Sequence, residues 1–201
     1  MFKYLCSLLA ASLLMCCSCS QTTDNRSKIL SLFDAINRHD VSAELAFFAE
    51  DVRYLMSGES PILGKPALRK LFEWDSTLAS KDEIGGVSVS GDTVVVDTLV
   101  EDSELAHLMG LPAMRSYPGS RFIFEKGLIK TVEYSDFLPE DTKIFRSRAT
   151  AFMHWFVNAH RERIKEIEDR TFFQFSSERA SDWLTLAAEW HEWKSTRGML
   201  N

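Results

Sequence analysis

Residues 87–96 have the sequence VSVSGDTVVV. Valines alternate with serines as far as the pair Gly91-Asp92, and a β-branched run follows this pair to Val96. Alternation with a period of two is typical of a strand, and a Gly-Asp pair between two such runs is typical of a tight turn. The stretch therefore predicts a β-hairpin near the middle of the chain.

Three helices are predicted before this hairpin. Apolar residues recur at helical spacing between Arg26 and Arg38, Asp40 can cap a short second helix, and Pro66 suits the first turn of a third. Between the second and third helices, Val52 to Met56 is predicted as a strand. The apolar residues on which the three helix predictions rest are Ile29, Leu32, Phe33, Ile36, Val41, Leu45, Phe48, Leu68, Leu71 and Phe72.

Two further strands are predicted after the hairpin, at Ser120 to Phe124 and at Leu128 to Tyr134. A short helical insertion, Ser103 to Gly110, separates them from the hairpin. Helices followed by antiparallel strands are typical of an α+β domain whose sheet curls around the helices.

Alternation also predicts which side of the second hairpin strand faces the core. One side carries Val94, Val96, Thr98 and Val100, whereas the other carries Asp97 and Glu101. Because the first side is the more apolar, we expect it to be buried. Asp97 and Glu101 would then lie on the outer face or in a dimer contact.

Five motifs follow one another through this region. They are NRHD at 37–40, FFAEDVRY at 47–54, LGKPAL at 63–68, GDTVVV at 91–96 and FIFEKGLI at 122–129. In order and spacing they resemble the nuclear transport factor 2-like (NTF2-like, or SnoaL-like) superfamily, over about residues 27–137. The resemblance implies a cone, in which N-terminal helices pack on a strongly curved, mostly antiparallel sheet. It leaves function open, because isomerases, dehydratases, hydrolases, binding proteins and transport adaptors share this fold.

The last third of the chain is predicted to be helical. One helix is expected from Glu140 to about Glu168, and a second from Ser177, its cap, to Gly198. Four of the five tryptophans lie here: Trp155, Trp183, Trp190 and Trp193. Bulky residues at helical spacing usually form core, so residues 138–201 are predicted as a two-helix extension packed on the cone.

The first nineteen residues have the layout of a signal peptide. Lys3 precedes an apolar run from Tyr4 to Met15, which is too short for a membrane span of roughly 20 residues. The cysteines that follow resemble the lipobox of bacterial lipoproteins, with Cys19 or Cys17 as the acylated residue. We therefore expect residues 1–19 to be a lipoprotein-type signal peptide with its lipobox and residues 20–26 to be a short linker. The protein would then be exported and held at the cell membrane or outer membrane by a lipid anchor. The alternative is a plain secretory signal.

Composition excludes several kinds of site. All four cysteines lie within the first nineteen residues, so the remaining chain has no disulfide framework and no cysteine-based zinc site. A formal net charge of −6 argues against nucleic acid as a partner. His154 and His160 are six residues apart, and His191-Glu192 lacks the second histidine of a zinc-protease motif. We expect no metal and no cofactor.

The known chemistry of the superfamily does not transfer. Ketosteroid isomerase uses a carboxylate base with a tyrosine and a neutral aspartic acid. The resemblance places these three roles on Met56, Leu32 and Ser120, none of which suits its role. No catalytic residue is therefore assigned.

Two kinds of function remain for the cone. The first is non-catalytic binding of a small apolar or amphipathic ligand, or action as an interaction module that forms a homodimer through its sheet face. The second is an enzyme of isomerase or dehydratase type using Tyr54, His107 or Asp97. The pocket candidates are Tyr54, Asp97, His107, Arg121 and Tyr134.

Overall fold

The computed structural model describes residues 24–56, 60–116 and 119–198. The predicted signal peptide and the acylated Cys19 or Cys17 lie outside the described residues. The first described helix covers residues 24–37, so the last three residues of the predicted linker, 24–26, are helical. Asn25, one of the three, is 1% exposed.

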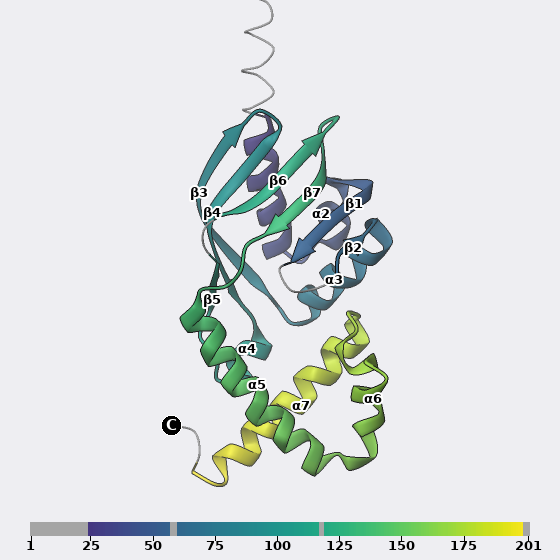
Figure 1. Cartoon of the computed structure of the whole chain (residues 1–201), viewed down its shortest axis with the longest axis vertical. Coiled ribbons are helices and arrows are strands. Elements are labelled where there is room, and N and C mark those ends of the chain that lie inside the picture. Colours follow the sequence, from purple (N-terminus) through teal and green to yellow (C-terminus); the bar gives the residue numbers. More distant parts are fainter. Residues whose placement is uncertain (1–23, 57–59, 117–118, 199–201) are drawn as a thin grey trace, which may run out of the picture.

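The sheet has the strand order β2-β1-β7-β6-β4-β3, with β5 paired to β4. Its strands are β1 (Phe48–Met56), β2 (Ile62–Leu63), β3 (Lys81–Ser90), β4 (Thr93–Asp102), β5 (Met114–Ser116), β6 (Ser120–Glu125) and β7 (Leu128–Tyr134). All pairings are antiparallel except β1 with β7. The predicted curved, mostly antiparallel sheet is therefore confirmed (Figure 1).

The predicted helices before the hairpin are also confirmed. After residues 24–37 come α2 (Val41–Ala46) and α3 (Lys65–Thr77), both on one face of the sheet (Figure 1). The Asp40 carboxylate accepts a hydrogen bond of 3.0 Å from the Ala43 N–H, as expected of a cap. Pro66 lies in the first turn of α3. These helices and the inner face of the sheet enclose one apolar core, which includes Leu32, Phe48, Leu68 and Phe122.

The predicted inner face of β4 is wrong beyond Val96. Val94 and Val96 are buried, but Thr98 is exposed and Leu99 is 1% exposed. The ladder pairs Gly85 with Thr98 and Val87 with Val96, and the position between them is occupied by Gly86 at a φ of +64°. This conformation, which favours glycine, interrupts the alternation, so the far half of β4 presents its other side to the interior.

The C-terminal extension contains more pieces than predicted. Helix α5 (Pro139–Ala159) ends at His160, where φ is −125°, and is followed by η1 (Arg161–Arg163), α6 (Ile164–Glu168), η2 (Thr171–Phe173) and α7 (Ser177–Ser195). The His160 ring packs on Trp155 and Phe156, with centroids 5.2 and 5.3 Å apart. This packing holds His160 outside the helix, so α5 does not continue into residues 161–163. The cap of α7 is Ser176, one residue before the predicted Ser177.

A second apolar core holds the extension together and joins it to the cone. It includes Phe152, Phe156, Trp190 and residues of α4 (Glu104–Met109), the predicted insertion. Helix α7 contacts α3 and α4, and Trp74 of α3 meets Trp183 at a centroid distance of 6.3 Å. The extension thus packs against one end of the cone (Figure 1). Among the described helices, none is long and apolar enough to cross a bilayer.

Candidate functional site

Two tyrosines stack at the end of the cone that faces the extension. Tyr54 lies near the end of β1, and Tyr134 is the last residue of β7. The parallel pairing of these strands brings the two rings to a centroid distance of 6.0 Å with an interplanar angle of 29°. Both side chains pack against the core of the cone.

Three carboxyl groups, those of Asp75, Asp82 and Glu101, lie near enough to the tyrosines to raise their pKa values. Asp82 of β3 and Glu101 of β4 are directly opposite each other in the ladder, and Asp75 lies near the end of α3. The side chain of Asn37 fixes the backbone of Asp82 by two hydrogen bonds of 2.8 Å. The Asn37 amide nitrogen donates to the Asp82 carbonyl, and the Asn37 amide oxygen accepts from the Asp82 N–H. We call Tyr54, Asp75, Asp82, Glu101 and Tyr134 the acid–tyrosine cluster.

Burial governs the electrostatics of the acid–tyrosine cluster. It raises the pKa of Glu101 and holds the pKa values of Asp75 and Asp82 well above their usual range. The neighbouring carboxylates raise the pKa values of Asp75, Asp82 and both tyrosines further. Among the described residues, no lysine or arginine lowers any of these pKa values. The carboxyl groups therefore retain protons at higher pH than ordinary carboxylates do.

Two further polar side chains border the acid–tyrosine cluster. Burial, with Asp40 nearby, raises the pKa of Glu44 in α2 to about 7. Ser80 directly precedes β3 and is 5% exposed, and its hydroxyl has no hydrogen-bond partner among the described residues. Since Ser80 and Asp82 are two residues apart at the start of a strand, alternation places them on the same face.

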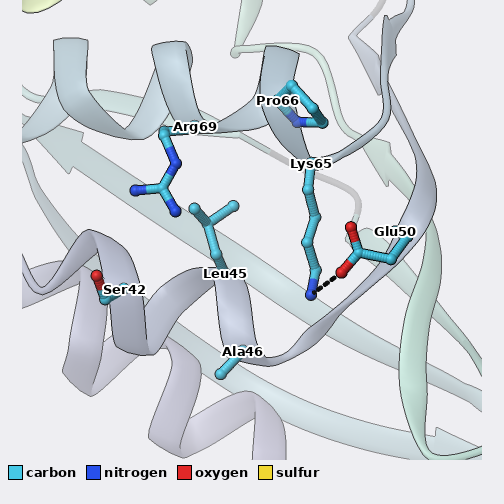
Figure 2. A pocket seen from close by; sticks show the side chains of 7 residues that line it. All are labelled: Ser42, Leu45, Ala46, Glu50, Lys65, Pro66 and Arg69. Atoms are coloured by element: carbon cyan, nitrogen blue, oxygen red, sulfur yellow. Dashed lines mark ion pairs between the residues drawn. The ribbon is translucent and has the colours of Figure 1, made fainter.

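A separate groove opens between α2, β1 and α3 (Figure 2). Its volume is about 510 Å³, and its lining residues are Ser42, Leu45, Ala46, Glu50, Lys65, Pro66 and Arg69. The Lys65 ammonium forms an ion pair of 2.9 Å with the Glu50 carboxylate. Figure 2 shows Arg69 and Lys65 extending from α3 on either side of Leu45.

The sequence model of the SnoaL-like domain matches residues 29–132, which is half of the chain. The chain belongs to the SnoaL-like domain family. The predicted family is thereby confirmed, and the cone is its SnoaL-like domain. The extension after residue 132 lies outside the match. A search of curated protein sequences finds no match to this chain.

Solved structures share the fold of the SnoaL-like domain. SalBIII, an epoxide hydrolase/cyclase-like enzyme of pyran ring formation in salinomycin, is 20% identical with a TM-score of 0.50; the match covers 60% of this chain and 96% of SalBIII. An LEH-like epoxide hydrolase of M. tuberculosis is 19% identical with a TM-score of 0.48, covering 57% and 80%. An NTF2-like protein from Cytophaga hutchinsonii is 14% identical with a TM-score of 0.47, covering 59% and 93%. At these identities the likeness concerns the fold.

The structure brings together only two of the five pocket candidates, Tyr54 and Tyr134. Asp97 is exposed on the outer side of β4. Arg121 pairs with Glu133 at 2.8 Å and is also exposed. His107 has a side chain that is 68% exposed and lies 2.9 Å from a carboxylate oxygen of Asp102. The structure therefore separates these three from the tyrosines.

The structure also shows where two of the positions compared with ketosteroid isomerase lie. Leu32 and Ser120 are each 1% exposed. Leu32 belongs to the apolar core, and the Ser120 hydroxyl accepts a hydrogen bond of 3.1 Å from the Ser135 N–H. The carboxyl groups that raise the pKa values of both tyrosines are Asp75, Asp82 and Glu101.

Sequence reasoning missed these three acids as pocket residues. Counting outward from the Gly91-Asp92 turn would have placed Asp82 opposite Glu101, which is the observed register. The alternation argument assigned Glu101 to the outer face because it did not allow for the interruption at Gly86. Within the described residues, no group of three or more histidine, cysteine, aspartate or glutamate side chains is arranged to hold a metal ion.

Proposed function

We propose that this protein binds a small, mostly apolar molecule at the acid–tyrosine cluster. The observation that carries the proposal is that three half-buried carboxyl groups, Asp75, Asp82 and Glu101, lie beside two stacked tyrosines with no basic side chain among the described residues to balance them. No hydrogen bond or ion pair from the described residues reaches the side chains of Asp75, Asp82 or Glu101. Burying polar groups without partners is costly, and raised carboxyl pKa values in one place are typical of functional sites.

The same groups indicate the chemistry of the ligand. The two tyrosine rings and Ile84, all packed against the core of the cone, offer an apolar surface. Carboxyl groups that keep their protons donate hydrogen bonds, as tyrosine hydroxyls do. We therefore expect a neutral molecule with an apolar body and an acceptor oxygen, such as a carbonyl, hydroxyl or ether.

Native mass spectrometry of the purified full chain tests the binding proposal. We expect a bound small molecule, with a lower occupancy in Glu101→Gln. The matched control is Glu133→Gln, since Glu133 pairs with Arg121 away from the acid–tyrosine cluster. An empty wild-type protein that also takes up no neutral apolar ligand from a panel would refute the proposal.

Acid–base catalysis at the same place is the second candidate. Asp82 and Glu101 lie directly opposite each other, and two carboxyl groups so placed resist being ionised together. One then keeps a proton to donate while the other accepts one. The test is a panel of carbonyl and epoxide compounds: turnover should be lost in Asp82→Asn and Glu101→Gln but kept in Asp97→Asn. Equal turnover in all three variants would exclude this role.

The location of the protein is a separate proposal. The layout of residues 1–19 supports export and a lipid anchor on Cys19 or Cys17. The mass of the mature N-terminus tests it directly. A protein that begins, unmodified, at Ser20 or later would not be lipid-anchored.

A homodimer through the sheet face is the partner proposal. The described helices 24–37, α2 and α3 lie on one face of the sheet, which leaves the face carrying Arg121 and Asp97 accessible (Figure 1). Light scattering of the purified protein tests this proposal. A monomer at micromolar concentration would contradict it.

A further inference from the structure

The groove between α2 and α3 lies away from the acid–tyrosine cluster. Both are bordered by α3, but Lys65 begins this helix and Asp75 lies near its end. At a rise of about 1.5 Å per residue, these positions are about 15 Å apart along the helix axis. The groove and the acid–tyrosine cluster are therefore two different places on the domain.

Positive charge reaches the groove from three sources. Lys65 and Arg69 are four residues apart on α3, so they lie on the same face of this helix. The third source is the N-terminus of α3 itself, a helix of 13 residues with no side-chain cap and no acidic residue in its first turn. Such an end carries an uncompensated partial positive charge.

Arg69 is the better placed of the two cations to receive a ligand. Its side chain is exposed, and within the described residues it forms no ion pair or hydrogen bond. A guanidinium group offers five N–H donors in a planar fork that matches an oxyanion. Lys65, by contrast, is already paired with Glu50, whose side chain is 84% exposed.

The remaining lining residues suit a short apolar group. Leu45, Ala46 and Pro66 line the groove together with the Ser42 hydroxyl. Figure 2 shows the Leu45 side chain between the two cations. An anion with an apolar substituent would meet complementary surfaces at both ends.

We propose that this groove binds an oxyanion, a phosphate or carboxylate group carried on a short apolar chain. Arg69 receives the oxyanion, and the apolar chain lies over Leu45 and Pro66. Glu50 acts as an internal competitor, because its carboxylate occupies Lys65 until the ligand arrives. The charge on Lys65 then becomes available to the ligand.

Titration calorimetry of the full chain with butyl phosphate at low salt tests the proposal. Arg69→Gln should weaken binding by about tenfold or more, since a hydrogen bond to a charged group is lost. Lys70→Gln is the matched control, because Lys70 is the next residue of α3, is exposed and does not line the groove. Its affinity should stay within about twofold of the wild type. Glu50→Gln should bind about threefold more tightly, as the competitor is removed.

Two further titrants define the ligand class and its source. Butanol should not bind in place of butyl phosphate, and butyrate should. Vesicles of phosphatidylglycerol, compared with vesicles of phosphatidylcholine, show whether the oxyanion is a lipid headgroup or a soluble anion. If it is a headgroup, the phosphatidylglycerol vesicles compete with butyl phosphate for the groove; if it is a soluble anion, they do not. Equal binding of butanol and butyl phosphate, or equal affinities of Arg69→Gln and Lys70→Gln, would overturn the proposal.

Discussion

Glu44 allows a quantitative test of the electrostatics around the acid–tyrosine cluster. It lies in α2 with 3% of its surface exposed, and burial raises its pKa from 4.5 to about 7. A carboxyl group with a raised pKa binds its proton more tightly in the folded state. Its contribution is therefore most favourable below pH 4.5 and is lost progressively as the pH rises to about 7.

The size of the effect follows from this shift. One pKa unit corresponds to about 1.4 kcal/mol, so ionised Glu44 costs up to about 3 kcal/mol. Because hydration near the protein surface reduces this cost, we expect about 2 kcal/mol. Glu44 also raises the pKa values of Asp75 and Asp82, so its removal acts in the same direction on these residues.

Urea unfolding of Glu44→Gln and the wild type at pH 4 and pH 8 measures the effect. At pH 8 the variant should be more stable by about 2 kcal/mol, which raises its Tm by about 4–8 °C. At pH 4 the two proteins should agree to within about 0.5 kcal/mol. Glu83→Gln, at an exposed position of β3, is the control and should show no such pH dependence. The reasoning is refuted if the stability difference is the same at both pH values.

Three further substitutions test other contacts. Asp141→Asn removes a carboxylate whose pKa is lowered by hydrogen bonds from Arg115. In thermal melts, the variant should be less stable than the wild type above about pH 4. This difference should vanish as the pH falls through the lowered pKa of Asp141, because the wild type then loses the same charge. Phe152→Ala empties a site that is 0% exposed and should cost about 3–5 kcal/mol in urea unfolding; a loss below about 1 kcal/mol would contradict the second core. Gly86→Ala places a Cβ at a φ of +64° and against an Asp97 carboxylate oxygen, and should lower stability by about 1–2 kcal/mol; an unchanged melting temperature would argue against the interruption in β3.

Local sequence signals accounted for most of the cone. The Gly91-Asp92 turn, the Asp40 cap and the placement of Pro66 each depend on nearby residues, and the structure contains all three. Strands β2 and β5 were not predicted, because pieces of two and three residues carry no readable alternation. Their pairing depends on neighbouring strands.

The candidate site was less accessible to sequence reasoning. Tyr54 and Tyr134 are far apart in the chain and meet only through the parallel pairing of β1 and β7. Asp75 faces the tyrosines from a helix, and its contribution depends on how α3 packs. The end of α5 before His160 was missed because the apolar pattern of the sequence continues past it. The helix ends there through a tertiary contact, the packing of the His160 ring on Trp155 and Phe156.

The parallel pairing of β1 with β7 also affects how the chain folds. Phe48 is paired with Ile129, about 80 residues later, and contacts of such long range form slowly. During synthesis β1 leaves the ribosome long before β7 exists, so the pairing of β1 with β7 cannot form on the incomplete chain. If the chain is exported as proposed, this delay would keep it in the unfolded state that passage through a narrow translocation pore requires.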